Sequence, residues 1–160
     1  MEDAFPIFEL YAQDKEVTRF LTFEPHHSIK VTKTFLEQCL NNWENNISFP
    51  WTIIRRRDKQ LLGMIEIVNI EQTGIQLGYV LAKKFWGNGY MTEALQKIIE
   101  WSFTQDDIYR VWAVCDIENT ASTRVLEKAG MQKEGVLRRW AILPYFGTKP
   151  RDCFCYSIVQ

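Results

Sequence analysis

The chain has 160 residues, of which 46% are hydrophobic, and its formal net charge at pH 7 is -1. This length and composition suit one compact domain over residues 1–160 and are too short for two ordinary ones. Lysine and arginine are scattered apart from the runs at 55–57 and 138–139, so no basic face for nucleic acid is expected. No charged leader precedes an apolar run and no stretch reaches the roughly 18 apolar residues of a membrane span. We therefore expect a cytoplasmic protein that binds neither nucleic acid nor membranes.

The first half of the sequence predicts two helices followed by three strands. Asp14 is placed to cap a short helix that runs to about Leu21, and Ser28 is placed to cap a second helix. In the second helix, apolar residues from Val31 to Trp43 recur at intervals of three and four, which indicates one buried stripe. Three runs rich in β-forming residues then predict an antiparallel meander, at 49–56, 61–70 and 75–82.

The second half alternates between helical and strand patterns. Helices are expected at 90–104 and 120–129, and strands at 109–115, 132–142 and 152–159. Alternation of strand and helix implies parallel pairing in this half, whereas the meander is antiparallel. The predicted fold class is therefore α/β, or α+β, with a mixed sheet and helices on its faces.

Cysteine and histidine are arranged in a way that excludes several kinds of site. The four cysteines form no CxxC pair, and Cys153 and Cys155 alternate along a predicted strand, as reduced core thiols do. The only histidines, His26 and His27, are adjacent in a predicted loop. A histidine-based zinc site or a catalytic triad therefore lacks its parts, and no metal is expected.

A glycine loop, Lys84-Phe85-Trp86-Gly87-Asn88-Gly89, joins the third predicted strand to a helix. The first turn of a helix has unpaired N–H groups that attract phosphate oxygens, and glycine lets the backbone approach them closely. The spacing matches neither the Walker loop nor the dinucleotide fingerprint. By itself, the loop is explained equally well by a simple turn between strand and helix.

Several motifs in order along the chain carry a resemblance to a known family. They are Gly78–Leu81, Lys84–Ala94, Glu118–Ser122, Leu126–Met131 and Glu134–Gly135. This series resembles that of the GNAT acetyltransferase superfamily, and within it the branch that acetylates the N-termini of ribosomal proteins. The resemblance extends from about residue 14 to residue 156. It implies a mostly antiparallel sheet with a splayed parallel strand pair, and acetyl-CoA as the cofactor.

The resemblance also implies which residues hold the cofactor. The family's loop binds the CoA pyrophosphate, which by position implies the backbone of Gly87, Asn88, Gly89, Tyr90, Met91 and Thr92. Lys84 stands where arginine or glutamine is usual and keeps a donor. A bulge in the strand before the loop exposes backbone that pairs with pantetheine, here the backbone of Val80, Leu81 and Ala82. The N–H of Leu81 is the implied oxyanion donor.

Asn119 and Ser122 form a second constellation, at the start of the helix expected at 120–129. Asn119 is explained as an ordinary N-cap, worth about 1 kcal/mol. The resemblance adds that Asn119 orients pantetheine and that Ser122 reprotonates the leaving thiolate.

The general base is poorly marked. The resemblance implies direct attack of a neutral amine, but the two positions where the family often has a carboxylate are Gln76 and Ala141. Glu66 is the remaining candidate acid, although a solvated strand face also accounts for it. Deprotonating an α-amine of pKa about 8 at pH 7 costs about 1.4 kcal/mol, against about 4.6 kcal/mol for lysine. A site without a strong base therefore favours an α-amine.

Tyr79, Trp140 and Tyr145 are the predicted acceptor contacts, although aromatic residues also serve as packing. The sequence thus predicts an acetyl-CoA-dependent N-acetyltransferase acting on a peptide N-terminus or a small amine, as a monomer or homodimer. An antibiotic, polyamine or amino-acid acetyltransferase and a CoA-binding regulatory module without catalysis are the alternatives. The family's first strand is expected to be shortened or missing.

Overall fold

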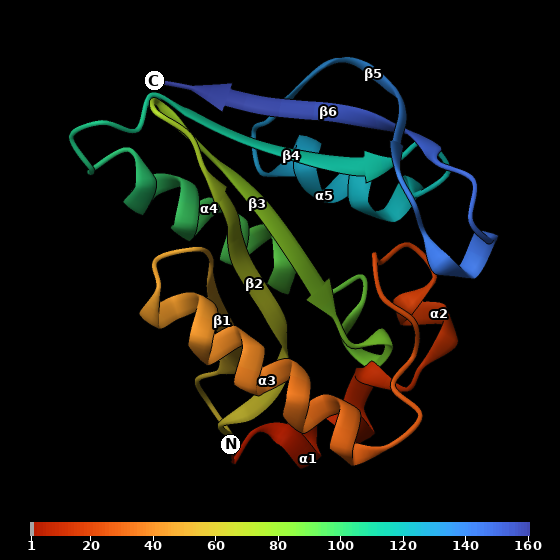
Figure 1. Cartoon of the computed structure of the whole chain (residues 1–160). Coiled ribbons are helices and arrows are strands. Elements are labelled where there is room, and N and C mark those ends of the chain that lie inside the picture. The colour runs from red at the N-terminus through yellow and green to blue at the C-terminus, as the bar shows by residue number, and fades with distance from the viewer. Residues whose placement is uncertain (1) are drawn as a thin grey trace.

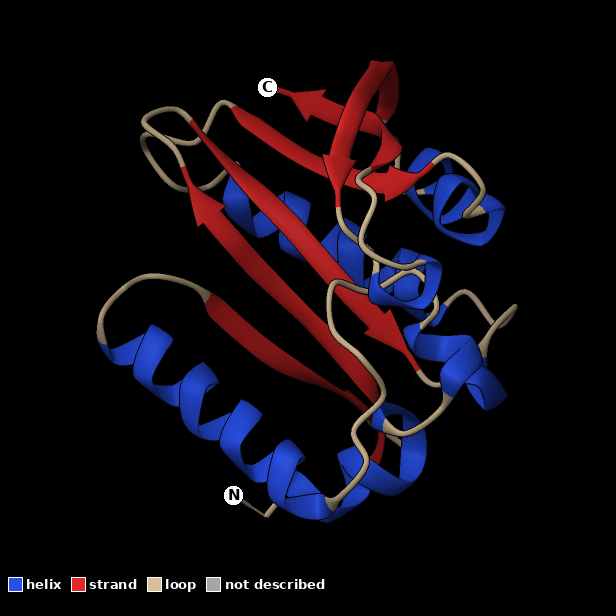
Figure 2. Cartoon of the chain, turned by 45° about the vertical axis from the view of Figure 1, so that its right-hand side comes forward, coloured by secondary structure: helices blue, strands red, loops and turns tan. Residues whose placement is uncertain are grey.

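The computed structural model describes residues 2–160, which form a six-stranded sheet with helices on both faces (Figures 1 and 2). The helical segments are α1 (Ala4–Ile7), η1 (Phe8–Ala12), α2 (Lys15–Thr18), α3 (Ile29–Glu44), η2 (Lys83–Phe85), α4 (Tyr90–Ser102), α5 (Thr120–Lys128) and η3 (Pro144–Phe146). The strands are β1 (Phe49–Arg55), β2 (Gln60–Ile70), β3 (Gly74–Leu81), β4 (Arg110–Asp116), β5 (Gln132–Ala141) and β6 (Arg151–Val159). The predicted fold class is confirmed, and each strand lies within one residue of its predicted bounds.

The strands follow the order β1-β2-β3-β4-β6-β5, and only β3 and β4 are parallel neighbours. Their pairing runs from Gly74 opposite Arg110 to Leu77 opposite Ala113. Beyond this point β3 stays paired with β2 and β4 stays paired with β6, but β3 and β4 no longer pair with each other. A gap therefore opens in the middle of the sheet, as the family resemblance implied. The gap is what makes the interior of the sheet accessible.

The bulge lies on β2, whereas the family resemblance implied a bulge on β3, the strand before the glycine loop. The register of β2 against β3 changes between Ile67, opposite Leu77, and Asn69, opposite Gln76. The extra residue is therefore Val68 on β2, and not a residue of β3. Because a bulge bends and twists the strand that carries it, β2 turns the paired β3 with it near the point where β3 leaves β4.

Each face of the sheet has its own apolar cluster. Alternate residues such as Ile65, Leu77 and Val111 pack against α4 and α5 on one face. On the other face, Leu62 and Met64 pack with residues of η1 and α3. Figure 1 shows α3 in front of β1 and β2, with α4 and α5 behind the sheet.

The N-terminal helical turns were only partly predicted. The carboxylate of Asp14 caps α2 by accepting the N–H of Glu16 at 2.8 Å, as expected, but α2 ends at Thr18 and not near Leu21. Ser28 directly precedes α3, yet its side chain makes no capping bond, so that part of the prediction is wrong. α1 and η1 were not predicted. Their short apolar pattern becomes helical because Ile7 and its neighbours pack against the sheet.

The C-terminal strands are tied to β4 by charged groups. The guanidinium of Arg151 donates to both carboxylate oxygens of Asp116, at 2.6 and 3.1 Å, and reaches Glu118 at 3.0 Å. The Asp152 carboxylate accepts the N–H of Arg139, which has a positive φ of 51° and interrupts the regular pairing of β5. These contacts are a structural clamp between β4, β5 and β6.

Candidate active site

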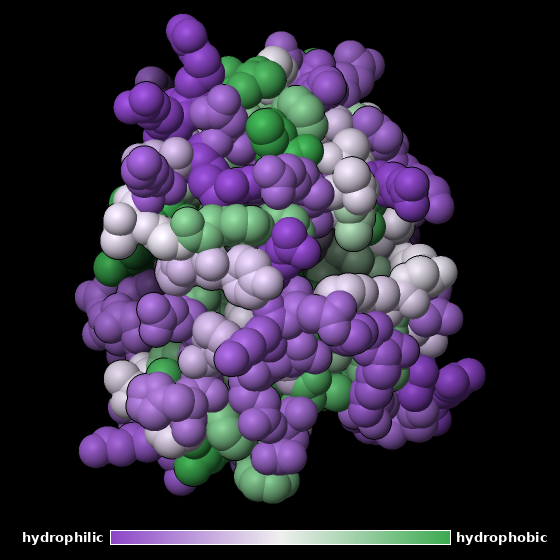
Figure 3. All heavy atoms as spheres, turned by 90° about the vertical axis from the view of Figure 1, so that its right-hand side faces the viewer, coloured by the Kyte–Doolittle hydropathy of each residue, from purple (hydrophilic) through white to green (hydrophobic). Residues whose placement is uncertain are grey.

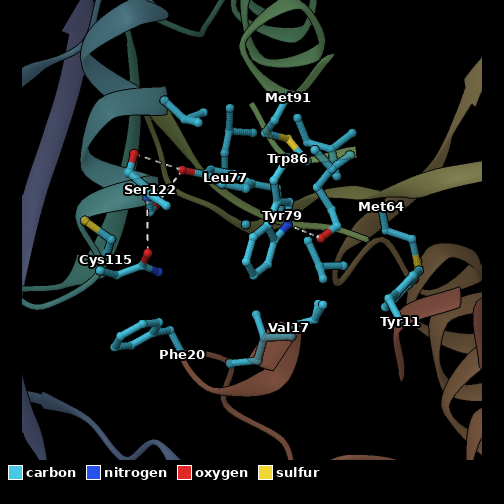
Figure 4. Close-up of a pocket in the computed structure, with 18 of the residues that line it drawn as sticks. Tyr11, Val17, Phe20, Met64, Leu77, Tyr79, Trp86, Met91, Cys115 and Ser122 are labelled. Carbon is cyan, nitrogen blue, oxygen red and sulfur yellow. Dashed lines mark hydrogen bonds between the residues drawn. The ribbon is translucent and has the colours of Figure 1, made fainter. Parts of the chain in front are cut away.

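A cavity of about 1190 Å³ lies where β3 separates from β4 (Figure 4). Its wall includes the loop before α4, the first turn of α5, and side chains from η1 and the segment after α2. The cavity is therefore lined from both faces of the sheet. One half is bounded by the glycine loop and α5, and the other by β2 and the N-terminal helical turns.

The N–H and C=O groups of successive β3 residues point alternately towards β2 and towards the gap. The N–H of Ala82 donates to the carbonyl of Leu62 at 2.9 Å, so Ala82 faces β2. Antiparallel pairs alternate in this respect, which turns Val80 towards β2 and Leu81 towards the gap. The carbonyl of Leu81 accepts the indole N–H of Trp86 at 2.7 Å. Of the three residues expected to pair with pantetheine, Leu81 turns its N–H towards the cavity, whereas the N–H of Ala82 is used in pairing with β2. Contact of Val80, Leu81 and Ala82 with pantetheine stays a prediction.

The glycine loop has the shape that an anion site needs. Gly87 and Gly89 have φ values of 76° and 79°, in the left-handed region that favours glycine, and a Cβ on either would meet nothing within 4 Å. Gly89 precedes α4, whose first residues Tyr90, Met91 and Thr92 line the cavity together with both glycines. The first-turn N–H groups of this helix are therefore presented beside open space.

Asn88 and Lys84 play other parts in this loop. The side-chain amide of Asn88 donates to the carbonyls of Phe85 and Trp86, at 3.2 and 2.9 Å, and so holds the turn in shape. Lys84 is exposed, its ammonium 5.0 Å from the ring centre of Phe85, and it is not part of the cavity wall. A contact of Lys84 with a bound phosphate stays a prediction.

Ser122 lies in the first turn of α5 and faces the gap. Its N–H donates to Asn119 Oδ1 at 3.1 Å, which confirms Asn119 as the N-cap of α5. Its hydroxyl is 2.6 Å from the phenol oxygen of Tyr79 (Figure 4). Burial raises the pKa of Tyr79 well above its usual value, and the buried Cys115 thiol, whose pKa is also raised by burial, lines the cavity next to this pair.

The other half of the cavity is floored by β2 and β3. Glu66 and Gln76 both line it, on the face opposite Tyr79, and Gly78 lies directly opposite Glu66 on β3. A Cβ on Gly78 would lie 2.8 Å from Val68 Cγ2, so a larger residue here would require the Val68 side chain to move. Glu66 is half-buried and forms no ion pair with any residue from 2 to 160.

His26 also lines this half of the cavity. The sequence placed His26 in a loop and did not predict it as a site residue. Its Nδ1 is 2.9 Å from Thr32 Oγ1, and burial lowers the pKa of His26. The His26 N–H of the main chain donates to the carbonyl of Ala12. These contacts fold the loop against η1 and α3.

Trp140 and Tyr145 lie outside the cavity wall. Trp140 is half-exposed on β5, with its ring centre 6.5 Å from that of Trp112. Tyr145 packs against Arg19, whose guanidinium is 5.3 Å from the Tyr145 ring centre and lines the cavity. A contact of Trp140 or Tyr145 with an acceptor stays a prediction. Ala141, at the end of β5, pairs with Arg151 of β6 and also lies away from the wall.

Metal-binding clusters and membrane-spanning helices are both absent from residues 2–160. Within that range, no three or more His, Cys, Asp or Glu side chains are grouped so that they could hold a metal ion. None of the helices described there has the length and apolar character needed to cross a membrane.

Comparison with known proteins identifies the family. The model of the acetyltransferase (GNAT) domain matches residues 1–132, which is most of the chain. The chain belongs to the GNAT acetyltransferases. The N-acetyltransferase YoaA of Bacillus subtilis is 33% identical over 161 residues, covering 99% of this chain and 89% of its own.

Solved structures have the same GNAT fold. The microcin C7 self immunity acetyltransferase MccE, in complex with acetyl-CoA and AMP, superposes with a TM-score of 0.87 at 24% identity. It covers 99% of this chain and 88% of its own. RimL, the ribosomal L7/L12 α-N-protein acetyltransferase, in complex with coenzyme A, gives 0.85 at 20% identity and covers 99% and 89%.

The protein is thus an acetyl-CoA-dependent N-acetyltransferase, and its residues fit the cofactor. The first turn of α4 offers N–H groups beside two glycines, and the gap in the sheet exposes the N–H of Leu81. The cavity runs past both, to Ser122. Bound acetyl-CoA supplies an acetyl group activated as a thioester.

Proposed function

We propose that the acceptor is the α-amine of a peptide N-terminus, bound in the half of the cavity floored by Glu66, Gln76 and Gly78. The observation that carries the proposal is the half-buried Glu66 carboxylate, which has no cationic partner among residues 2–160. A carboxylate held partly out of water favours a positively charged ligand. Gly78, directly opposite Glu66 on β3, adds no side chain to this part of the cavity wall.

The reaction needs three groups of this chain. Glu66 binds the acceptor ammonium and takes a proton from it, directly or through water. The Leu81 N–H, free of a partner on β2, stabilises the oxyanion. The Ser122 hydroxyl gives a proton to the departing thiolate. We further propose that residues 1–160 act as one catalytic domain, and that the reaction takes place in the cytoplasm, which suits four free cysteines.

An α-amine suits this site better than a lysine or a polyamine. Glu66 is a single carboxylate, which matches the single charge of an α-ammonium group. Deprotonating an α-amine at pH 7 also costs about 3 kcal/mol less than deprotonating a lysine side chain. Of the other carboxylates on the wall, Glu16 pairs with Lys83, Glu118 pairs with Arg151, and Glu93 lies in the first turn of α4. Arg19 lines the same cavity, and its positive charge would repel a second ammonium group.

The test is thiol release from acetyl-CoA with a panel of acceptors. Short peptides with free and with blocked α-amines, a lysine side-chain substrate and a polyamine are compared at equal concentration. We expect the free α-amine to be preferred at neutral pH. A preference for lysine or the polyamine would refute the assignment, and CoA binding without turnover on any amine would support the regulatory module.

The role of Glu66 is tested with a matched variant. Glu66→Gln should raise the acceptor KM and lower kcat by about 10²-fold, the lower end of what a general base contributes, with CoA affinity unchanged. Glu71→Gln, an exposed glutamate after β2 and outside the cavity wall, serves as the control. Equal kinetics for the two variants would remove Glu66 from the reaction.

A further inference from the structure

The hydrogen bond between Tyr79 and Ser122 joins two residues from distant parts of the chain at the point of reaction. Tyr79 lies two residues beyond Leu77, the last residue of β3 that pairs with β4. Its phenol oxygen is 2.6 Å from Ser122 Oγ and 3.5 Å from the carbonyl oxygen of Ser122. Figure 4 shows the Tyr79 side chain reaching across the gap from β3 to the first turn of α5.

The chemistry of the two hydroxyls gives the bond a direction. A phenol is more acidic than an alcohol, so it is the better donor, and a serine oxygen accepts readily. The main-chain carbonyl of Ser122 can only accept a hydrogen bond. Both Ser122 oxygens near the phenol, the hydroxyl and the carbonyl, are therefore compatible with Tyr79 as the donor. With its oxygen accepting, Ser122 keeps its own proton free for a third group.

We propose that Tyr79 is a positioning residue for Ser122, which it orients and strengthens as the proton donor to the departing thiolate. Asn119 fixes the main chain of Ser122, and Tyr79 fixes its side chain. The hydrogen bond from the phenol also stabilises the negative charge that grows on the serine oxygen as it gives up its proton. The inference rests on the role proposed for Ser122.

The proton balance of the step is complete. The amine nitrogen bonds to the carbonyl carbon, the C–S bond breaks, and its electron pair goes to sulfur. Sulfur takes the proton of Ser122 while the proton lost by the amine passes through Glu66 to solvent. Solvent then returns one proton to Ser122, and Tyr79 keeps its own throughout. Burial, which raises the pKa of Tyr79, keeps the phenol protonated over the working range of pH.

The test removes only the phenol oxygen. Tyr79→Phe should lower kcat about tenfold, the effect of one lost hydrogen bond to a group that becomes charged, with the KM for acetyl-CoA changed less than about threefold. The control is Tyr156→Phe, which removes the hydroxyl of a buried tyrosine. This hydroxyl donates at 3.1 Å to Glu127, which lies on α5 as Ser122 does. The control should lose stability and keep kcat.

A double-mutant cycle separates positioning from packing. If Tyr79 acts through Ser122, Tyr79→Phe should have no further effect on kcat in a Ser122→Ala background. Additive losses, an unchanged kcat in Tyr79→Phe, or an equal kcat loss in Tyr156→Phe would overturn the proposal. CoA affinity measured by calorimetry shows that each variant is folded.

The assay uses whichever primary amine the wild-type enzyme acetylates. A wild-type enzyme that is inactive on peptides but active on another amine refutes the peptide assignment and leaves the test of Tyr79 valid. If Ser122→Ala keeps the wild-type kcat, the acid role of Ser122 fails, and that of Tyr79 fails with it.

Discussion

Gly63 on β2 lies opposite Leu81 on β3, where the main chain of β3 leaves no space for a side chain on Gly63. Ala82 forms the hydrogen-bonded pair with Leu62, so Gly63 and Leu81 form the non-hydrogen-bonded pair, with the shorter Cα separation. A methyl group at Gly63 would overlap the carbonyl oxygen of Val80 and lie 2.9 Å from Leu81 Cα. All of these neighbours are main-chain atoms, which cannot rotate away.

The expected cost of Gly63→Ala follows from these distances. Carbon atoms pack at about 3.5 Å or more, so β3 must move from Gly63 by about 0.6 Å at Leu81. Overpacking of this kind costs about 1–3 kcal/mol in the free energy of unfolding. The same movement shifts the Leu81 N–H, the proposed oxyanion donor. A misplacement of about 0.6 Å there should lower kcat by about tenfold, because a shift of about 1 Å can cost about 100-fold.

The assay combines urea unfolding with steady-state kinetics. The control is Gly135→Ala on β5, where a Cβ meets nothing within 4 Å and φ is ordinary, so little change is expected. If Gly63→Ala matches this control in stability, the packing argument is refuted. If it is destabilised but keeps the wild-type kcat, Leu81 is not the oxyanion donor.

Three other changes test separate features of the enzyme. Gly89→Ala, at a φ of 79° with open space around it, should cost about 1–2 kcal/mol of backbone strain and weaken CoA binding in calorimetry; unchanged affinity would contradict the loop's role. Asn119→Ala should lower the free energy of unfolding by about 1 kcal/mol, and Asn119→Asp should restore it; if Asn119→Asp also restores CoA affinity, Asn119 is only a cap. The Arg110 guanidinium lowers the pKa of Glu134 from 4.5 to about 2, so this pair stabilises the fold above pH 4.5 and the effect is lost as the pH falls towards 2. Glu134→Gln should therefore lower the free energy of unfolding at pH 7, by under about 1 kcal/mol because the Glu134 side chain is 42% exposed. The stabilities of the variant and the wild type should converge near pH 2. A constant difference in stability at all pH values would contradict this.

The surface gives no simple guide to the site. The side of the molecule that carries α2 has hydrophobic atoms between hydrophilic ones and no uniform apolar or polar face (Figure 3).

The sequence by itself determined the strands, the helices α3 to α5 and the glycine loop. These depend on local periodicity and on glycine, which act over a few residues. The left-handed φ values of Gly87 and Gly89 are an example, since only glycine adopts them without strain.

Tertiary structure decided the rest, because register and long-range contacts leave no local pattern. The extra residue at Val68 fixes which residues of β2 and β3 face each other, and hence that Leu81 and not Ala82 turns its N–H to the gap. Glu66 was already a candidate acid from the sequence, but its place in the cavity wall and its lack of an ion pair within residues 2–160 followed only from the fold. The bond between Tyr79 and Ser122 spans 43 residues of sequence and exists because β3 leaves β4 where α5 begins. The half of the site expected to bind acetyl-CoA could thus be predicted from sequence motifs, whereas the half proposed to bind the acceptor depends on contacts that only the fold creates.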